Sequence, residues 1–135
     1  IPYELYIDLI MPYSKRILNA AREFNCPTIF FPKDIGNGIS MIDNQICDFV
    51  SVDWHTPIEH ARKALNEKVG IQGNMDPRIF YQDYKEIEKY LDSLTNFGSQ
   101  NKNWIFNLGH GFLPDIDHEK VKFVVNWIKD NNWNR

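Results

Sequence analysis

The chain has 135 residues, of which 43% are hydrophobic and 24% charged, with a formal net charge of -3. This composition is typical of one folded globular domain and excludes a disordered chain. The acidic balance argues against a nucleic-acid surface, which normally shows an excess of basic residues. No apolar run reaches the ~18 to 20 residues of a membrane span, and no secretion signal is evident, so we expect a soluble, unexported protein.

The beginning of the chain and its cysteines give two further expectations. The sequence begins at Ile1 and enters a helical pattern at once, as though cut from something longer. Cys26 and Cys47 belong to no CxxC or Cys/His cluster, so we expect two small buried residues in a reducing compartment.

The first third of the chain predicts a helical segment followed by a strand. Residues 3–24 have helical periodicity, and Pro12 either kinks one helix or begins a second. The apolar positions of this segment that share one helical face are Ile17, Leu18, Ala21 and Phe24. Residues 28–31 form a short continuous apolar run, which is typical of a strand buried on both faces. A loop with two glycines leads from there to a weak helix over residues 39–46.

A second and a third strand are expected over residues 49–53 and 69–72. Between them, Thr56, Pro57 and Glu59 form a capping box, with Thr56 as the cap of a helix that ends near residue 66.

The last part of the chain repeats the pattern. Asp76 before Pro77 predicts a capped helical turn, and Asp83 with Glu86 predicts a second capping box on a helix that Gly98 closes. A fourth strand is expected over residues 104–107. The last helix is marked by apolar residues at i, i+3, i+4 and i+7, which are Val121, Val124, Val125 and Ile128.

Four strands that alternate with helices indicate an α/β fold with a parallel sheet and right-handed crossovers. Two architectures fit this order: an open doubly wound sheet, or half of an eight-stranded (β/α) barrel. In both, function lies at the carboxyl ends of the strands, where the strand-to-helix loops meet. These loops are residues 32–38, 54–56, 73–77 and 108–115.

His110 is the strongest candidate for a functional side chain, because it lies in the fourth of these loops between Gly109 and Gly111. The flanking glycines allow unusual dihedrals and close approach of a ligand. A loop histidine that bonds a nearby carbonyl is the alternative. In the third loop, Asn74 could offer its amide to a ligand, whereas Asp76 is better explained as a helix cap.

Other polar residues have simpler explanations. Lys33 and Asp34 could form a charged pair at the cleft, although a solvated loop pair is the more common arrangement. Asp53, at the end of the second strand, is either catalytic or an acceptor for loop amides. The remaining histidines are expected at the surface or near helix starts, and they are His55, His60 and His118. No metal-binding spacing, phosphate loop or nucleophile elbow occurs, so we expect no metal site.

Three motifs in this order and spacing closely resemble the C-terminal half of the uroporphyrinogen decarboxylase family. They are VSVDW at residues 50–54, IQGNMDP at 71–77 and IFNLGHGFLPD at 105–115, and the helix with Met11-Pro12-Tyr13 also resembles a family helix. The resemblance implies that residues 1–135 form the C-terminal half of a single (β/α)8 TIM-barrel domain. It also implies a homodimer in the cytoplasm, or in a plastid.

The activity that the resemblance implies is removal of CO2 from the four acetate side chains of uroporphyrinogen III, which gives coproporphyrinogen III in heme biosynthesis without a metal or organic cofactor. His110 matches the family's active-site histidine, which contacts a substrate carboxylate, and Phe31 matches an aromatic residue of the pocket. The residues expected to bind substrate are His110, Phe31, Gly109, Gly111 and Asn74. An Arg-Gln-Ala-Gly-Arg segment and an aspartate of the family's N-terminal half are not in this sequence, so we expect no turnover by this chain alone.

Two alternatives stay open. Methyltransferases of the same fold, which act on cobalamin and coenzyme M, resemble this chain but carry a His-x-Cys zinc pair and a further cysteine. The corresponding positions here read Phe30-Phe31-Pro32 and Leu108-Gly109-His110, which disfavours zinc. The other alternative is a non-catalytic binding module. In either case a half-barrel leaves sheet edges uncovered, which predicts closure by a partner half.

Overall fold

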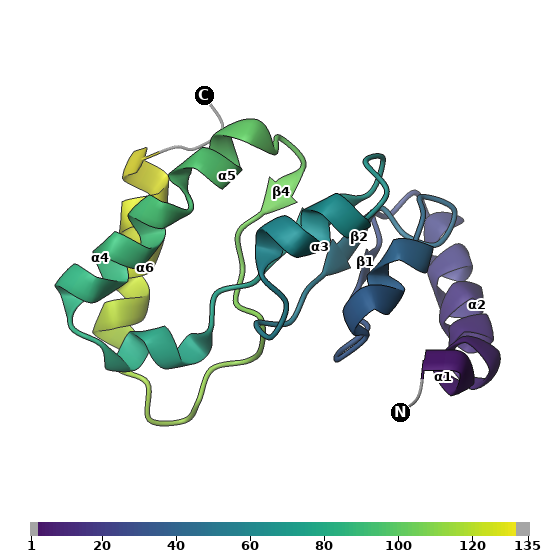
Figure 1. Cartoon of the computed structure of the whole chain (residues 1–135), viewed down its shortest axis with the longest axis horizontal. Helices are drawn as coiled ribbons and strands as arrows, with labels where there is room; N and C mark the ends of the chain where they lie inside the picture. Colours follow the sequence, from purple (N-terminus) through teal and green to yellow (C-terminus); the bar gives the residue numbers. More distant parts are fainter. Residues whose placement is uncertain (1–2, 132–135) are drawn as a thin grey trace.

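The chain alternates helices and strands along its whole described length, residues 3–131 of a computed structural model (Figure 1). The elements in chain order are α1 Tyr3–Leu9, α2 Met11–Arg22, β1 Ile29–Phe30, η1 Gly36–Met41, β2 Phe49–Ser51, α3 Ile58–Ala64, β3 Gly70–Gln72, η2 Pro77–Tyr81, α4 Tyr84–Ser93, α5 Thr95–Gln100, β4 Trp104–Ile105 and α6 His118–Asn131. The prediction that residues 1–135 form one half-barrel domain extends to residues 1, 2 and 132–135, which lie outside the described part.

The four strands form one parallel sheet in the order β1-β2-β3-β4, which confirms the predicted alternation of parallel strands and helices. The register places one residue of each strand in a single row, and this row consists of Phe30, Val50, Ile71 and Trp104. Val50, Ile71 and Trp104 are buried in a core that includes Ala61 of α3 and Leu91 of α4. Helices therefore cover this face of the sheet.

The opposite face of the sheet is open, and we call it the concave face. Ile29 and Ile105, on neighbouring rows, are 47% and 38% exposed, and Phe31 just beyond β1 is 43% exposed. The prediction that residues 28–31 are buried on both faces is therefore wrong for this chain. A doubly wound sheet carries helices on both faces, so the one-sided cover matches a barrel segment.

The N-terminal helical segment is two helices, since α2 begins at Met11 with Pro12 in its first turn. Leu18 packs in the core, but Ile17 is 71% exposed and Phe24 is 79% exposed. The predicted apolar stripe is therefore only partly covered. Periodicity identifies a helix face, but it does not say whether another element is present to bury it.

Two of the predicted helix starts are confirmed. The Asp76 carboxylate accepts a hydrogen bond from the Arg78 backbone N–H at 2.9 Å, and the Asp83 carboxylate accepts one from the Glu86 backbone N–H at 2.9 Å. The Thr56 cap is wrong, because α3 begins one residue later than expected and Pro57 occupies the cap position without a side-chain bond.

Other helix boundaries differ from prediction. Gly98 does not close the helix that contains Leu91: the chain bends at Leu94, and Gly98 is buried within α5. The weak helix predicted over residues 39–46 is the short 3-10 helix η1, displaced toward the glycines, and α3 ends at Ala64.

The two cysteines lie in different environments. Cys47 is fully buried as predicted, and burial raises the pKa of its thiol to about 12. Cys26 is exposed, so that prediction is wrong for this residue, which follows the turn after α2. Among residues 3–131, no helix is both long and apolar enough to cross a bilayer.

Candidate active site at the carboxyl edge of the sheet

The loop that carries His110 is fixed to its neighbour by backbone hydrogen bonds. Met75 donates its N–H to the Asn107 carbonyl at 3.1 Å, and Gly109 donates its N–H to the Met75 carbonyl at 2.9 Å. Met75 and Leu108 form a parallel bridge beyond the ends of β3 and β4. The β4–α6 loop therefore continues the sheet pairing up to the residue before His110.

Gly109 is needed because this loop also lies directly against the loop after β2. A Cβ added at Gly109 would come within 2.3 Å of the Trp54 backbone nitrogen, whereas one added at Gly111 would meet nothing within 4 Å. Neither glycine has a positive φ; the described glycines that do are Gly36 and Gly73. Neither glycine uses the left-handed dihedrals that it allows, and Gly109 serves the close packing of two backbones.

The exposed His110 lies between two hollows. The first has a volume of about 290 Å³ on the concave face, and its lining consists of Ile29, Phe31, Ser51, Gln72, Asn107, Leu108, Gly109, His110 and Gly111. The structure thus brings together four of the five residues that the sequence nominates for substrate binding. We call this hollow the concave hollow.

The second hollow, of about 240 Å³, lies across the four loops that follow β1, β2, β3 and β4, and we call it the loop hollow. Its lining consists of Lys33, Asp53, Trp54, His55, Asp76, Pro77, Arg78, Gly109, His110, Gly111 and Leu113. His110 therefore forms part of the wall of both spaces.

Asn74, the fifth nominated residue, lines neither hollow. It is buried, and its Nδ2 donates to the backbone carbonyls of Asp53 at 2.9 Å and Thr56 at 2.6 Å. Both amide hydrogens thus hold the β2–α3 loop in place. The contact of Asn74 with substrate stays a prediction. Only its amide oxygen is available for such a contact, because its amide nitrogen already donates to the two carbonyls.

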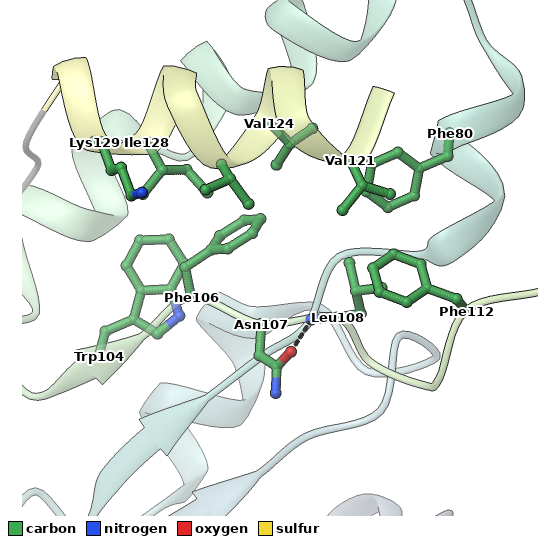
Figure 2. A pocket seen from close by; sticks show the side chains of 11 residues that line it. Phe80, Trp104, Phe106, Asn107, Leu108, Phe112, Val121, Val124, Ile128 and Lys129 are labelled. Atoms are coloured by element: carbon green, nitrogen blue, oxygen red, sulfur yellow. Dashed lines mark hydrogen bonds between the residues drawn. The ribbon is translucent and has the colours of Figure 1, made fainter. Parts of the chain in front are cut away.

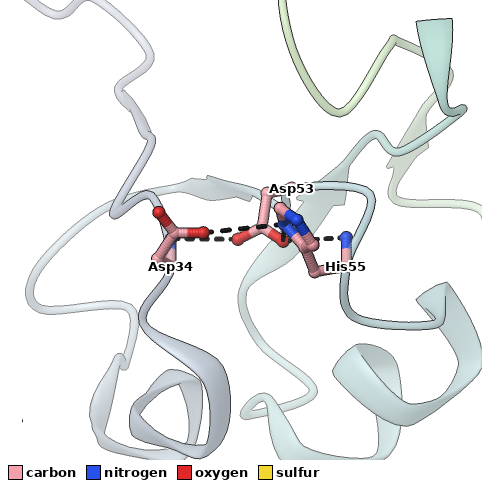
Figure 3. A group of neighbouring side chains, drawn as sticks. All are labelled: Asp34, Asp53 and His55. Atoms are coloured by element: carbon pink, nitrogen blue, oxygen red, sulfur yellow. Dashed lines mark hydrogen bonds and ion pairs between the residues drawn. The ribbon is translucent and has the colours of Figure 1, made fainter. Parts of the chain in front are cut away.

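Asp53 connects two loops at the edge of the sheet (Figure 3). Its carboxylate is buried and accepts from the backbone N–H of Asp34 and of His55, each at 3.0 Å. The acceptor interpretation of Asp53 therefore describes this structure. Asp34 does not pair with Lys33; its carboxylate lies 3.6 Å from His55 Nδ1, which is also 3.3 Å from Asp53.

The same three residues are the described group closest to a metal-binding arrangement, because one ligand atom from each lies within 4.8 Å of the others. Both oxygens of Asp53 already accept backbone amides, however, and His55 stacks on Trp54 with ring centroids 3.9 Å apart. These contacts indicate that the three residues hold the loops after β1 and β2 together.

Arg78 lines the loop hollow and is held in place there. Its guanidinium lies 4.1 Å from the centre of the Trp54 ring and bonds Asp76 through Nε, at 3.0 Å, and Nη2, at 2.7 Å. Partial burial alone would raise the pKa of Asp76, but the hydrogen bonds and charge of Arg78 outweigh it and lower that pKa. The bond to Asp76 raises the pKa of Arg78 in turn.

A larger hollow lies elsewhere, between α6 and β4 (Figure 2). It has a volume of about 480 Å³ and is lined mainly by apolar side chains, including Phe106, Phe112, Val121 and Val125. Asn107 and Lys129 are its polar members, and Asn107 bonds the backbone of Leu108. Size alone would favour this hollow, but its lining contains no imidazole or carboxylate and Lys129 is its one ionisable side chain, so the smaller spaces beside His110 are the better candidates.

Sequence reasoning missed Ser51 and Gln72, which lie side by side on the concave face with Gln72 Nε2 donating to Ser51 Oγ at 3.3 Å. The signal was present, since each follows a buried Val50 or Ile71 and neighbouring strand residues point to opposite faces. Arg78 and Trp54 were also missed. Only the fold brings these two residues together.

A parallel sheet covered on one face, with its polar groups at the carboxyl edge, defines the class of (β/α)-barrel proteins. The family model described as uroporphyrinogen decarboxylase (URO-D) matches residues 1–131, and the chain belongs to this family.

Similar proteins named uroporphyrinogen decarboxylase occur in several bacteria. The one from Vesicomyosocius okutanii is 34% identical over 91% of this chain and 36% of its own length. Those from Helicobacter acinonychis and Chlorobium phaeobacteroides are each 36% identical, over 93% and 94% of this chain and 37% and 38% of their own lengths. The chain thus spans little more than a third of these relatives.

Proposed function

We propose that this chain is part of a uroporphyrinogen decarboxylase, which removes CO2 from the four acetate side chains of uroporphyrinogen III to give coproporphyrinogen III. The observation that carries the proposal is the exposed His110 at the wall of the concave hollow that Phe31 also lines. Membership of the family over residues 1–131 supports it.

The residues of the concave hollow suit a polycarboxylated ring. The His110 imidazole can donate an N–H to a carboxylate, and the Ser51 hydroxyl and Gln72 amide add neutral donors. Ile29 and Phe31 provide apolar walls, which exclude water and strengthen those hydrogen bonds.

Decarboxylation leaves an electron pair on the carbon that held CO2, and this pair needs a place to go. A pyrrole ring protonated on carbon accepts it, so the substrate itself can act as the electron sink. The protein then has to hold the carboxylates and stabilise the ring cation. His110 can do the first, and a buried carboxylate facing the ring would do the second.

The remaining groups belong to the part of the family barrel that this sequence does not contain. We propose that residues 1–135 alone show no turnover, and that the whole enzyme is a cytoplasmic homodimer, as the resemblance implies. The methyltransferase alternative has no support at the corresponding positions, since Phe30 and Pro32 stand where that group carries the His-x-Cys zinc pair, and Leu108-Gly109-His110 contains no cysteine.

A chimera tests the proposal. This chain replaces the matching segment of the Helicobacter acinonychis relative, and conversion of uroporphyrinogen III to coproporphyrinogen III is followed by chromatography. We expect turnover, and we expect His110→Asn to lower kcat/KM at least about tenfold, because a hydrogen bond to a charged group is lost.

His118→Asn, an exposed histidine of α6, is the matched control and should leave kcat/KM unchanged. A folded chimera in which the two variants behave alike would contradict a role for His110. A folded chimera that binds uroporphyrinogen without turnover would favour the non-catalytic binding module.

A further inference from the structure

We propose that the loop hollow is a second carboxylate subsite, in which Arg78 binds one carboxylate arm of the ligand whose body lies on the concave face. The identity of that ligand as a polycarboxylated tetrapyrrole rests on the proposed function; the subsite itself rests on the residues described below.

Arg78 is the donor best prepared for this role. Asp76 and the Trp54 ring fix two sides of its guanidinium, so little side-chain freedom is lost when an anion binds. Its Nη1 has no protein acceptor among residues 3–131, and the side chain is 57% exposed. A planar guanidinium with free N–H groups is the preferred partner of a carboxylate.

The formal charges of the lining side chains balance, with Lys33 and Arg78 against Asp53 and Asp76. The Asp76 carboxylate is paired with the Arg78 guanidinium, and both oxygens of Asp53 accept backbone amides. Lys33, also at the rim, makes no hydrogen bond or ion pair among the described residues, and its ammonium can approach the same anion.

Size and position fit one arm of a larger ligand. At about 240 Å³ the hollow is smaller than the ~300 to 1,000 Å³ that encloses a drug-sized molecule, so it takes a side arm and leaves the ring outside. His110, Gly109 and Gly111 line both this hollow and the concave hollow, so a ligand in one reaches the other across His110.

The test uses the 135-residue chain, labelled with 15N and titrated with sodium propionate at constant ionic strength against sodium chloride. NMR signals of the Trp54 indole N–H and the Arg78 Nε–H report on the hollow. We expect both to shift to saturation with propionate. We expect Arg78→Gln to weaken binding about tenfold or more, judged by Trp54, as for the loss of a charge-assisted hydrogen bond.

Arg16→Gln is the matched control, because it removes the same charge from an exposed position on α2. Lys33→Gln is a second variant that leaves the Arg78–Asp76 pair intact, and it should weaken binding less than Arg78→Gln. A wild-type titration without saturation, or equal affinities of the Arg78 and Arg16 variants, would overturn the subsite.

A parallel titration with uroporphyrin, an octacarboxylate, and its octamethyl ester separates this inference from the proposed function. Arg78-dependent binding of propionate without binding of uroporphyrin would support the subsite and count against the tetrapyrrole. Binding of uroporphyrin that Arg78→Gln leaves unchanged would overturn the subsite and leave the proposed function standing. Binding of the ester as tight as that of the acid would also overturn it.

Discussion

The two faces of the sheet differ sharply although the same strands build both. On the helix-covered face, Val50 and Ile71 are fully buried. On the concave face, the next residues along the same strands are Ser51 and Gln72, which line the hollow beside His110. Because neighbouring residues of a strand point to opposite faces, the chain separates the residues that stabilise it from those available to bind a ligand.

The largest expected effect compares isoleucines on the two faces. Ile71→Ala should lower the free energy of unfolding by about 2 to 5 kcal/mol, because it leaves a cavity in the core. Ile29→Ala, the same change on the concave face, should cost less than about 1 kcal/mol, because Ile29 is 47% exposed. Urea denaturation measures both, and equal losses would show that the concave face also carries the stability of the chain.

A smaller effect is expected from the glycines that flank His110. Gly109→Ala should cost about 1 to 3 kcal/mol and shift the Trp54 indole N–H signal, because its methyl group would overlap the Trp54 backbone. Gly111→Ala is the matched control and should stay within about 0.5 kcal/mol, since its methyl group points into open space. If the two variants had equal stability, the close contact of these loops would not exist in solution.

The smallest effect concerns Asp48, the residue that immediately precedes β2. The backbone N–H of Thr28 lowers the pKa of Asp48 most, its hydroxyl and the Arg22 guanidinium add to this, and partial burial opposes it. Since the folded pKa lies below the unfolded value of about 3.9, the stabilisation is full above that pH and is lost as the pH falls through the folded pKa.

Asp48→Asn should therefore cost less than about 1 kcal/mol at pH 6, because the side chain is 43% exposed, and less still at pH 3. Urea denaturation at the two pH values provides the measurement. Asp92→Asn, at an exposed position of α4 with no ionic partner among the described residues, serves as the control. A cost that grows toward low pH would reverse the sign of the argument.

Local signals explain what the sequence predicts well. Asp76 and Asp83 are caps whose bonds reach only two or three residues ahead, and the apolar runs at β2 and β3 need no partner to be recognised. Phe31 and His110 line the same hollow because the carboxyl ends of parallel strands lie at one edge of the sheet.

What the sequence does not predict depends on distant contacts. Position 109 requires a glycine because the backbone of Trp54, which is 55 positions earlier in the chain, lies against it. No local sequence pattern reveals this contact. Likewise, Arg78 acquires its fixed orientation from Trp54, which belongs to another loop. Ile17 and Phe24 show the reverse case. They belong to a clear apolar helical pattern, yet both side chains are largely exposed in the described structure.

The most direct test of this account is a map of where a porphyrin octacarboxylate binds. Chemical-shift changes on adding uroporphyrin to the labelled chain should concentrate at Phe31, Gln72 and His110, around the concave hollow. Changes confined to Val121 and Val125, in the larger apolar hollow beneath α6, with the His110 signals unmoved, would contradict it.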